Sequence, residues 1–273
     1  MKDKLVQAKD ILTLLPPVLQ GKGGHFLIQA LMHLAGIRYA NKVYDNSKHF
    51  TGAPFCTDAL DKLGIKRDVK NIEVFDSLKD QPYITVSNHP FGHIDGIVLM
   101  ELMVSINKNY KILVNYFLGL IDTMADNFIS VNPHAQNQTT LKGIKECIAH
   151  LNSGNSLGLF PAGAVSKFKK ENGRLIIEDR EWQQSIIKLI QKAKVPVVPI
   201  HISGRNSKFF YALRWFGYQV RDLRLCHELY NKKKTTVTLT IGNPIMPETI
   251  GEFSNAGELG EFLKKLTYQL STI

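Results

Sequence analysis

Short runs of apolar and β-branched residues alternate with longer helical patterns along most of the chain. Strand, helix, strand repetition of this kind predicts an α/β fold, a mostly parallel sheet flanked by helices on both faces. The predicted strands lie at 72–75, 83–87, 111–114, 128–131, 157–160, 195–202 and 235–241. The predicted helices lie at 94–106, 137–152, 181–193 and 257–270.

The first 65 residues have a helical pattern throughout, split by Pro16, Pro17 and the glycines within 21–24. We expect residues 1–65 to form an N-terminal helical cap and residues 66–273 to form the α/β domain, both within one structural unit. No stretch reaches the roughly 18 uninterrupted apolar residues that a transmembrane helix needs. The start of the chain does not read as a signal peptide, so we expect the protein to stay on the side of the membrane where it is made.

The chain has 273 residues, with 34 Lys and Arg against 24 Asp and Glu, and 44% of its residues are hydrophobic. This composition excludes a disordered, collagen-like or disulfide-scaffold chain. Cys56, Cys147 and Cys226 lie far apart and form no C-x-x-C pair, so they predict neither a metal knuckle nor a disulfide framework. We interpret them as reduced thiols in a cytosolic compartment.

The basic excess lies mainly in the second half, where residues 151–273 hold 18 basic and 10 acidic residues. Cations interleaved with amphipathic rings between 205 and 234 suit an anionic bilayer surface. Nucleic acid would be attracted by the same charge, and a solvated basic face with its rings turned into the core is an equal alternative. The interleaved rings are Phe209, Phe210, Tyr211, Trp215, Phe216 and Tyr218.

The segment Ser-Asn-His-Pro-Phe-Gly-His-Ile-Asp-Gly at 87–96 follows a predicted strand and leads into a predicted helix. Ligands of open α/β sheets bind in loops at the carboxyl ends of strands, where this segment lies. Across the turn, the Asp95 carboxylate can accept from one ring nitrogen of His89 and leave the other nitrogen as a proton acceptor. A base oriented in this way contributes about 10²- to 10⁴-fold to a reaction rate.

This segment resembles the first motif of the lysophospholipid and glycerol-phosphate acyltransferase superfamily. It most resembles the bacterial branch of hemolysin-type, ornithine-lipid and glycine-lipid O-acyltransferases. The resemblance implies a glycerol-phosphate acyltransferase-like fold in which His89 is the general base, Asp95 holds it, and a substrate hydroxyl attacks an acyl thioester. Five residues separate His89 from Asp95, as in that branch, whereas the wider superfamily has four.

The segment at 160–166 resembles the third motif of the superfamily, whose common form is Phe-Pro-Glu-Gly-Thr-Arg-Ser. The matching residues, all expected to bind substrate, are Phe160, Pro161, Gly163 and Ser166. Val165 stands where the motif has Arg, and this removes a bidentate anion fork. We therefore expect the acceptor to be a lyso-amino-acid lipid, such as a lyso-ornithine or lyso-glycine lipid, in preference to lysophosphatidate.

The fourth motif, Val-Pro-x-x-Pro, is matched at 195–199 and is followed by the Gly-Arg-Asn-Ser of the same branch at 204–207. Arg205 is a candidate clamp for a carboxylate or phosphate in place of the missing motif arginine, and it is equally well interpreted as a surface cation. Asn206 and, in the first motif, Asn88 complete the residues expected to bind substrate.

The resemblance implies a donor carried by acyl carrier protein or coenzyme A, a lyso-lipid acceptor, and a peripheral position at the cytoplasmic face of the inner membrane. It implies no metal, organic cofactor or nucleic-acid partner. Two alternatives stay open. His93 completes His-x₃-His-x-Asp with His89 and Asp95, a spacing that could bind a metal and activate water for hydrolysis, unless His93 is only a structural loop residue. A non-catalytic peripheral lipid-binding protein would not need His89.

Overall fold

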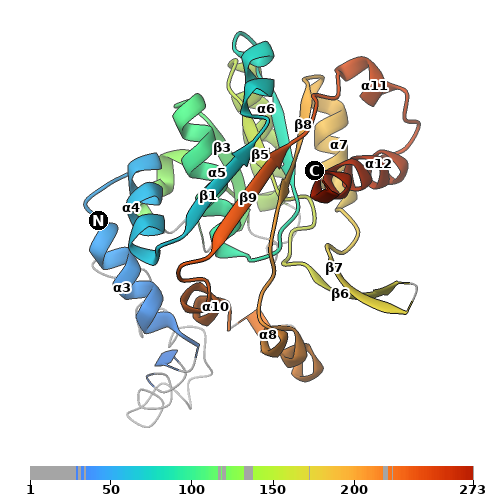
Figure 1. The fold of residues 1–273 in the computed structure, drawn as a ribbon. Coiled ribbons are helices and arrows are strands. Elements are labelled where there is room, and N and C mark those ends of the chain that lie inside the picture. Colours follow the sequence, from blue (N-terminus) through green and yellow to red (C-terminus); the bar gives the residue numbers. More distant parts are fainter. Residues whose placement is uncertain are drawn as a thin grey trace.

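The structure is a computed structural model that describes residues 29, 32–33, 35–115, 118, 121–131, 138–171, 173–217, 221–222 and 224–272. In this part of the chain, seven strands form one sheet in the order β1-β9-β8-β2-β5-β3-β4 (Figure 1). The strand pairs are parallel except β8 with β9, so the predicted mostly parallel α/β sheet is confirmed. The strands are β1 (Lys66–Lys70), β2 (Ile84–Ser87), β3 (Lys111–Asn115), β4 (Phe128–Val131), β5 (Leu157–Leu159), β8 (Val197–Ile202) and β9 (Thr236–Ile241).

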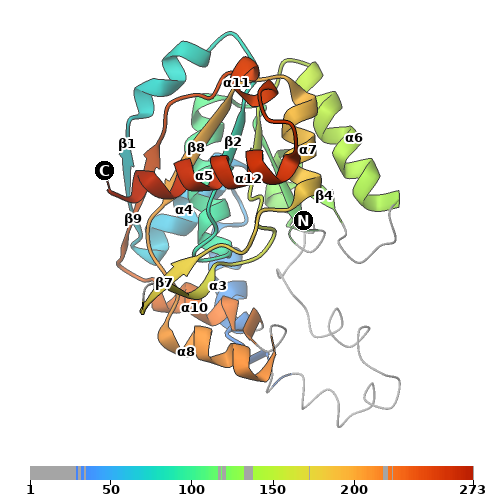
Figure 2. The same ribbon diagram turned by 90° about the vertical axis from the view of Figure 1, so that its right-hand side faces the viewer.

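Helices cover both faces of the sheet, as the apolar central strands require. On one face, α3, α4, α5 and α10 enclose a core that includes Leu60, Leu99 and Ile200. On the other, α6, α7 and α12 enclose a core that includes Ile190 and Leu263. Figure 2 shows α12 and α7 in front of the sheet and α4 and α5 behind it. The helices are α3 (Ile37–Ser47), α4 (Ala53–Leu63), α5 (His93–Ile106), α6 (Gln138–Asn152), α7 (Gln184–Ala193), α8 (Lys208–Ala212), α10 (Leu225–Asn231), α11 (Pro247–Gly251) and α12 (Ala256–Gln269).

The described part of the expected N-terminal cap is helical and shares the core of the α/β domain. Tyr44 of α3 and Phe55 of α4 are buried in the same cluster as Leu99 of α5. Residues 1–28 of the cap lie outside the described residues. None of the described helices is both long and apolar enough to cross a bilayer.

The strand predicted at 72–75 is wrong, because this segment belongs to a 3-10 helix, η2 (Ile72–Leu78). Phe75 and Leu78 are buried while Ile72 is 46% exposed. Spacing of three places Phe75 and Leu78 on one side of a 3-10 turn. The first strand is β1 instead, which escapes prediction because it is a polar edge strand that pairs only with β9 in the described residues.

A two-stranded antiparallel hairpin, not predicted from the sequence, projects from the sheet. It consists of β6 (Lys167–Glu171) and β7 (Arg174–Glu178). The hairpin follows the loop after β5, and β5 pairs in parallel with β2. The loops that leave β2 and β5 therefore lie side by side at the carboxyl edge of the sheet.

Candidate active site

His89 and Asp95 meet at the carboxyl end of β2. His89 lies in the loop between β2 and α5, and Asp95 is in the first turn of α5, where its carboxylate can satisfy free N–H groups of the helix start. The Nδ1 atom of His89 lies 2.9 Å from Oδ2 of Asp95, whose side chain is 0% exposed. The same Oδ2 accepts hydrogen bonds from the backbone N–H of Phe91 (2.9 Å) and Gly92 (2.8 Å). The carboxylate is therefore fixed. With Nδ1 turned toward it, Nε2 of His89 points away from Asp95 and can accept a proton.

The imidazole of His89 borders an apolar cavity of about 210 Å³. Its ring lies against the Phe160 ring, with the two centroids 4.5 Å apart. The cavity is walled by α3, α4, α5, α10 and the strands β3 and β4. Its lining includes Val43, Phe55, Ile97, Val114, Phe128 and Leu229. A partly exposed base at the edge of an apolar, concave space fits a substrate with a hydrocarbon chain.

A second buried carboxylate, Asp179, holds the backbone of the His89 loop. Its Oδ1 accepts from the Ser166 hydroxyl (2.6 Å) and from the His89 backbone N–H (3.2 Å), and its Oδ2 accepts from Trp182 Nε1 (3.2 Å). Burial raises the pKa of Asp179, while the hydrogen bond from Ser166 and the charge of His89 act in the opposite direction. Sequence reasoning missed Asp179. One sequence signal points to it. Asn-Gly is typical of a hairpin turn, and Asp179 directly follows the second strand of the hairpin that such a turn predicts, close to the third motif.

Ser166 joins the third motif to the first. It is 1% exposed, its hydroxyl is used by Asp179, and its N–H donates to the carbonyl of His89 (2.9 Å). Pro161 is buried, and its carbonyl accepts from the backbone N–H of Gln183 (2.9 Å). The structure thus places Ser166 in the support of the His89 loop, and its expected contact with substrate stays a prediction.

Gly163 lines the cavity with a φ of 58°, and a Cβ at this position would collide with the side-chain amide of Gln183. The positive φ favours a glycine here, whereas the Gln183 side chain could move aside. The guanidinium of Arg180 lies beside this loop, since its Nε donates to the carbonyl of Ala162 (2.7 Å) and its Nη2 would be 3.5 Å from that Cβ. The segment after β7 thus places a cation beside the third motif, which the sequence did not indicate.

The two asparagines expected to bind substrate both hold backbone. Asn88 is 3% exposed and makes two hydrogen bonds to Ile202, accepting from its N–H (2.7 Å) and donating to its carbonyl (2.9 Å). Asn206 is also 3% exposed and donates to the carbonyl of Phe91 (3.1 Å). Arg205 is exposed and is not among the residues that line the cavity. Substrate contact by these three residues stays a prediction.

His93 lines the cavity from the first position of α5. Burial lowers its pKa, and the neighbouring His89 acts in the same direction. Among the described residues, no three His, Cys, Asp or Glu side chains form a group that could hold a metal ion. The metal-dependent alternative therefore finds no ligand set in this part of the chain.

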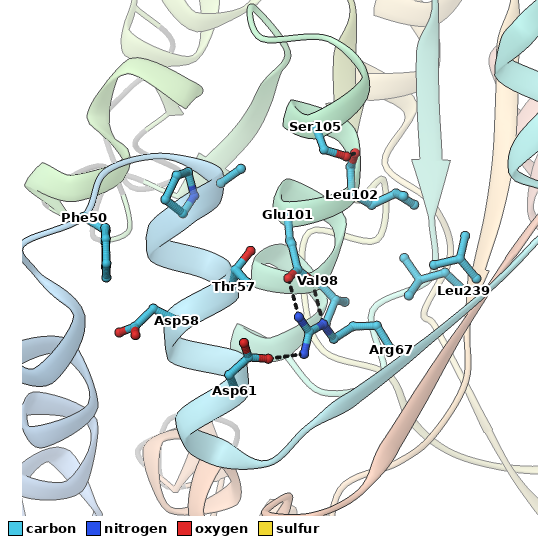
Figure 3. Close-up of a pocket in the computed structure, with 13 residues that line it drawn as sticks. Phe50, Thr57, Asp58, Asp61, Arg67, Val98, Glu101, Leu102, Ser105 and Leu239 are labelled. Carbon is cyan, nitrogen blue, oxygen red and sulfur yellow. Dashed lines mark hydrogen bonds and ion pairs between the residues drawn. The ribbon is translucent and has the colours of Figure 1, made fainter.

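A second groove, of about 680 Å³, lies away from His89 between α4, α5, β1 and β9 (Figure 3). Its guanidinium, Arg67, donates to both carboxylate oxygens of Glu101 (2.8 and 2.6 Å) and to Asp61 (2.6 Å). The positive charge of Arg67 is thus neutralised by Glu101 and Asp61. His89, Asp95 and the apolar cavity lie together at the first site, away from this groove.

A family described as acyltransferase has a model that matches residues 26–272. The chain belongs to this acyltransferase family. The acyltransferase identity inferred from the motifs is confirmed, and the protein is an enzyme of acyl transfer.

Two curated relatives of this acyltransferase are named lyso-glycine lipid O-acyltransferase. The protein from Bacteroides thetaiotaomicron is 31% identical over 256 residues, covering 90% of each chain. The protein from Phocaeicola vulgatus is 29% identical over 253 residues, covering 90% of this chain and 88% of that protein. A solved structure, the 1-acyl-sn-glycerophosphate acyltransferase PlsC from Thermotoga maritima, shares the fold with a TM-score of 0.53 and 18% identity, and the match covers 90% of this chain and 88% of that one.

Proposed function

We propose that this acyltransferase moves a fatty acyl group from a thioester, carried by acyl carrier protein or coenzyme A, to the hydroxyl of a lyso-amino-acid lipid. The observation that carries the proposal is the His89–Asp95 pair at the edge of an apolar cavity. The names of the two curated relatives support a lyso-glycine lipid as the acceptor. No metal or organic cofactor takes part.

In the proposed reaction, Nε2 of His89 removes the proton of the acceptor hydroxyl as its oxygen attacks the thioester carbonyl. The tetrahedral intermediate collapses, the carbon–sulfur bond breaks, and the thiolate receives the proton from the imidazolium. Asp95 keeps the ring oriented and stabilises its positive charge between the two steps. One proton and one acyl group move, and the products are an ester and a thiol.

The loop that carries the third motif supports an acceptor without a phosphate. Val165 leaves this loop without the arginine of the motif, and Arg180 is placed beside it instead. The Arg180 guanidinium can pair with the carboxylate of a glycine head group. We place the enzyme at the cytoplasmic face of the inner membrane, where such an acceptor would lie.

The test compares acceptors and donors with purified protein. Lyso-glycine lipid, lyso-ornithine lipid and lysophosphatidate are each incubated with acyl carrier protein and coenzyme A thioesters, and the diacylated products are measured by mass spectrometry. We expect the amino-acid lipids to be acylated faster than lysophosphatidate. We also expect a metal chelator to leave the acylation rate unchanged. Faster acylation of lysophosphatidate would overturn the acceptor assignment.

His89→Ala tests the mechanism in the same assay. We expect it to lower kcat by about 10²- to 10⁴-fold, because the general base is lost. His49→Ala, at an exposed histidine outside the cavity lining, is the matched control and should keep the wild-type rate. Full acyl transfer by His89→Ala would refute the general-base role.

A further inference from the structure

The outer surfaces of α3, α8 and α10, together with the 3-10 helix η5 (Leu213–Phe216), carry exposed rings in contact with cations. These elements gather at one end of the molecule in both ribbon views (Figures 1 and 2). Trp215 is 83% exposed, Phe209 56% and Tyr230 52%. We call this surface the aromatic–basic belt, and its members are Tyr39, Phe209, Arg214, Trp215, Arg224, His227, Tyr230 and Lys233.

Contacts connect much of the belt into a series. The Arg224 guanidinium lies 4.9 Å from the Phe209 ring centroid, and its Nη2 is 3.4 Å from Nε2 of His227. The His227 ring is 6.1 Å from the Tyr230 ring. Lys233 then lies over both Tyr230 (4.5 Å) and Tyr39 (4.7 Å). At the other side of α8, the Arg214 guanidinium lies 6.0 Å from the Trp215 ring.

The structure separates these residues from neighbours that the sequence could not distinguish. Phe210 and Tyr211, grouped with them by sequence, are buried and pack on Phe168 and Ile177 of the β6–β7 hairpin. Tyr218 lies outside the described residues. Some rings of this stretch therefore enter the core, as one interpretation expected, and others stay at the surface.

The belt also has a fixed relation to the cavity. In α10, Cys226 and Leu229 line the cavity, while His227 and Tyr230 belong to the belt. In α3, Ala40 and Val43 line the cavity, while Tyr39 belongs to the belt. The same two helices therefore present an apolar inner face to the cavity and an aromatic, cationic outer face to solvent.

We propose that the aromatic–basic belt docks the protein on an anionic lipid bilayer. Exposed rings that also interact with cations suit the headgroup layer, where amphipathic rings reside and Lys and Arg are attracted to anionic lipids. An acidic protein would also suit the cations, and the assays below distinguish it from a bilayer. Trp215, 83% exposed, is the ring best placed to enter the headgroup layer. Docking here brings the wall of the cavity to the membrane. The inference rests on the proposed lipid acceptor, but docking itself is measured without substrates.

The experiment uses sedimentation with vesicles of phosphatidylcholine alone or with phosphatidylglycerol. The full chain should bind the anionic vesicles, and added salt should weaken the binding. Phe209→Ser/Trp215→Ser and Arg214→Gln/Lys233→Gln should each lower the partition coefficient about tenfold or more. Met246→Ser, an exposed apolar residue next to α11 at the opposite end of the molecule, and Lys192→Gln on α7 should bind as the wild type does (Figure 1).

Tryptophan fluorescence gives a second readout. The chain has two tryptophans, and Trp182 is only 6% exposed. Brominated lipid should quench Trp215 on docking, and Trp215→Phe should remove this quenching while keeping the vesicle binding. Wild-type vesicle binding by both double variants would overturn the inference, whatever their activity. Loss of transfer from acyl carrier protein with unchanged vesicle binding would identify the belt as a protein-docking surface and also overturn it.

Two acyl-transfer assays distinguish a failure of this inference from a failure of the proposed function. With a short-chain acceptor dispersed as monomers, the belt variants should keep the wild-type rate. With the acceptor embedded in vesicles, their rate should fall in parallel with binding. Absence of acyl transfer by the wild type in both assays would count against the proposed function and leave the vesicle result unaffected.

Discussion

Asp95 and Asp179 are both buried beside His89, but they contact different parts of it. Asp95 faces the ring nitrogen, and Asp179 accepts from the backbone N–H. One carboxylate orients the imidazole and the other fixes the chain that carries it. The two roles lead to different expectations for substitutions.

Asp95→Asn should lower kcat by about 10²- to 10⁴-fold while the melting temperature changes little. The amide oxygen can still accept from Phe91 and Gly92, but it no longer stabilises the positive ring. Steady-state kinetics and thermal unfolding of the same preparation measure both effects. A variant that keeps its kcat would show that the ring needs no carboxylate.

Ser166→Ala should lower the free energy of unfolding by about 1–3 kcal/mol, because the buried Asp179 carboxylate loses a donor at 2.6 Å. KM for the acceptor should stay unchanged, since the hydroxyl is turned toward Asp179. Denaturant unfolding and acceptor titrations measure the two quantities. Ser153→Ala, at an exposed hydroxyl at the end of α6, is the matched control. A raised KM with unchanged stability would instead support a substrate contact.

At the scale of elements, the loop after β8 packs against the catalytic loop, which follows β2. Gly204 has a φ of 123° and lies directly on the Phe91 ring. Asn206 holds the carbonyl of Phe91, and Ser207 caps α8 and donates to the buried Glu228 (2.6 Å). The Gly-Arg-Asn-Ser segment therefore supports the first motif from behind.

Gly204→Ala should destabilise the protein by about 2 kcal/mol or more, because the new methyl group is strained at this φ and displaces Phe91. It should also lower kcat, since Phe91 and His89 share one loop. Gly251→Ala, where a Cβ meets nothing within 4 Å, is the control and should stay within about 0.5 kcal/mol. Equal stability of the two variants would contradict the packing role.

Much of this element structure could be predicted from the sequence, because buried strands and amphipathic helices have strong periodic patterns. The predicted helix at 257–270 corresponds to α12 (Ala256–Gln269), and the predicted strand at 195–202 corresponds to β8. Polar strands such as β1 and β6 have no such pattern. The motif histidine and aspartate could be found by their spacing, but Asp179 and Arg180 reach the site only through a hairpin whose path the sequence does not reveal.

At the scale of the whole molecule, the free energy of unfolding depends on pH through His201, whose pKa is lowered in the folded protein. His201 lies in β8, and burial lowers its pKa to about 4. In the unfolded chain its pKa is about 6.5. The unfolded state therefore binds more protons between these two values, and stability present above pH 6.5 is lost as the pH falls toward 4.

His201→Gln should reduce this acid sensitivity. Relative to the wild type, the variant should gain on the order of 3 kcal/mol between pH 7 and pH 4, because it has no proton to take up on unfolding. Denaturant unfolding at pH 7, 5.5 and 4 measures the difference. Parallel pH profiles for the two proteins would contradict a buried neutral His201.

Different elements supply the proton-transfer groups and the apolar wall of the cavity. The proton-transfer groups belong to the loop after β2 and the start of α5. Another part of the cavity wall comes from α3 and α10, which meet where a Cβ at Gly36 would lie 2.6 Å from the His227 backbone. α10 also packs on the start of α5, since a Cβ at Gly92 would lie 3.0 Å from Leu225. The cavity-lining side chains of α3 are therefore the ones that can be exchanged with least effect on the imidazole. We expect substitutions at the cavity-lining positions of α3, such as Val43, to change the length of fatty chain that the enzyme accepts while leaving its turnover unchanged.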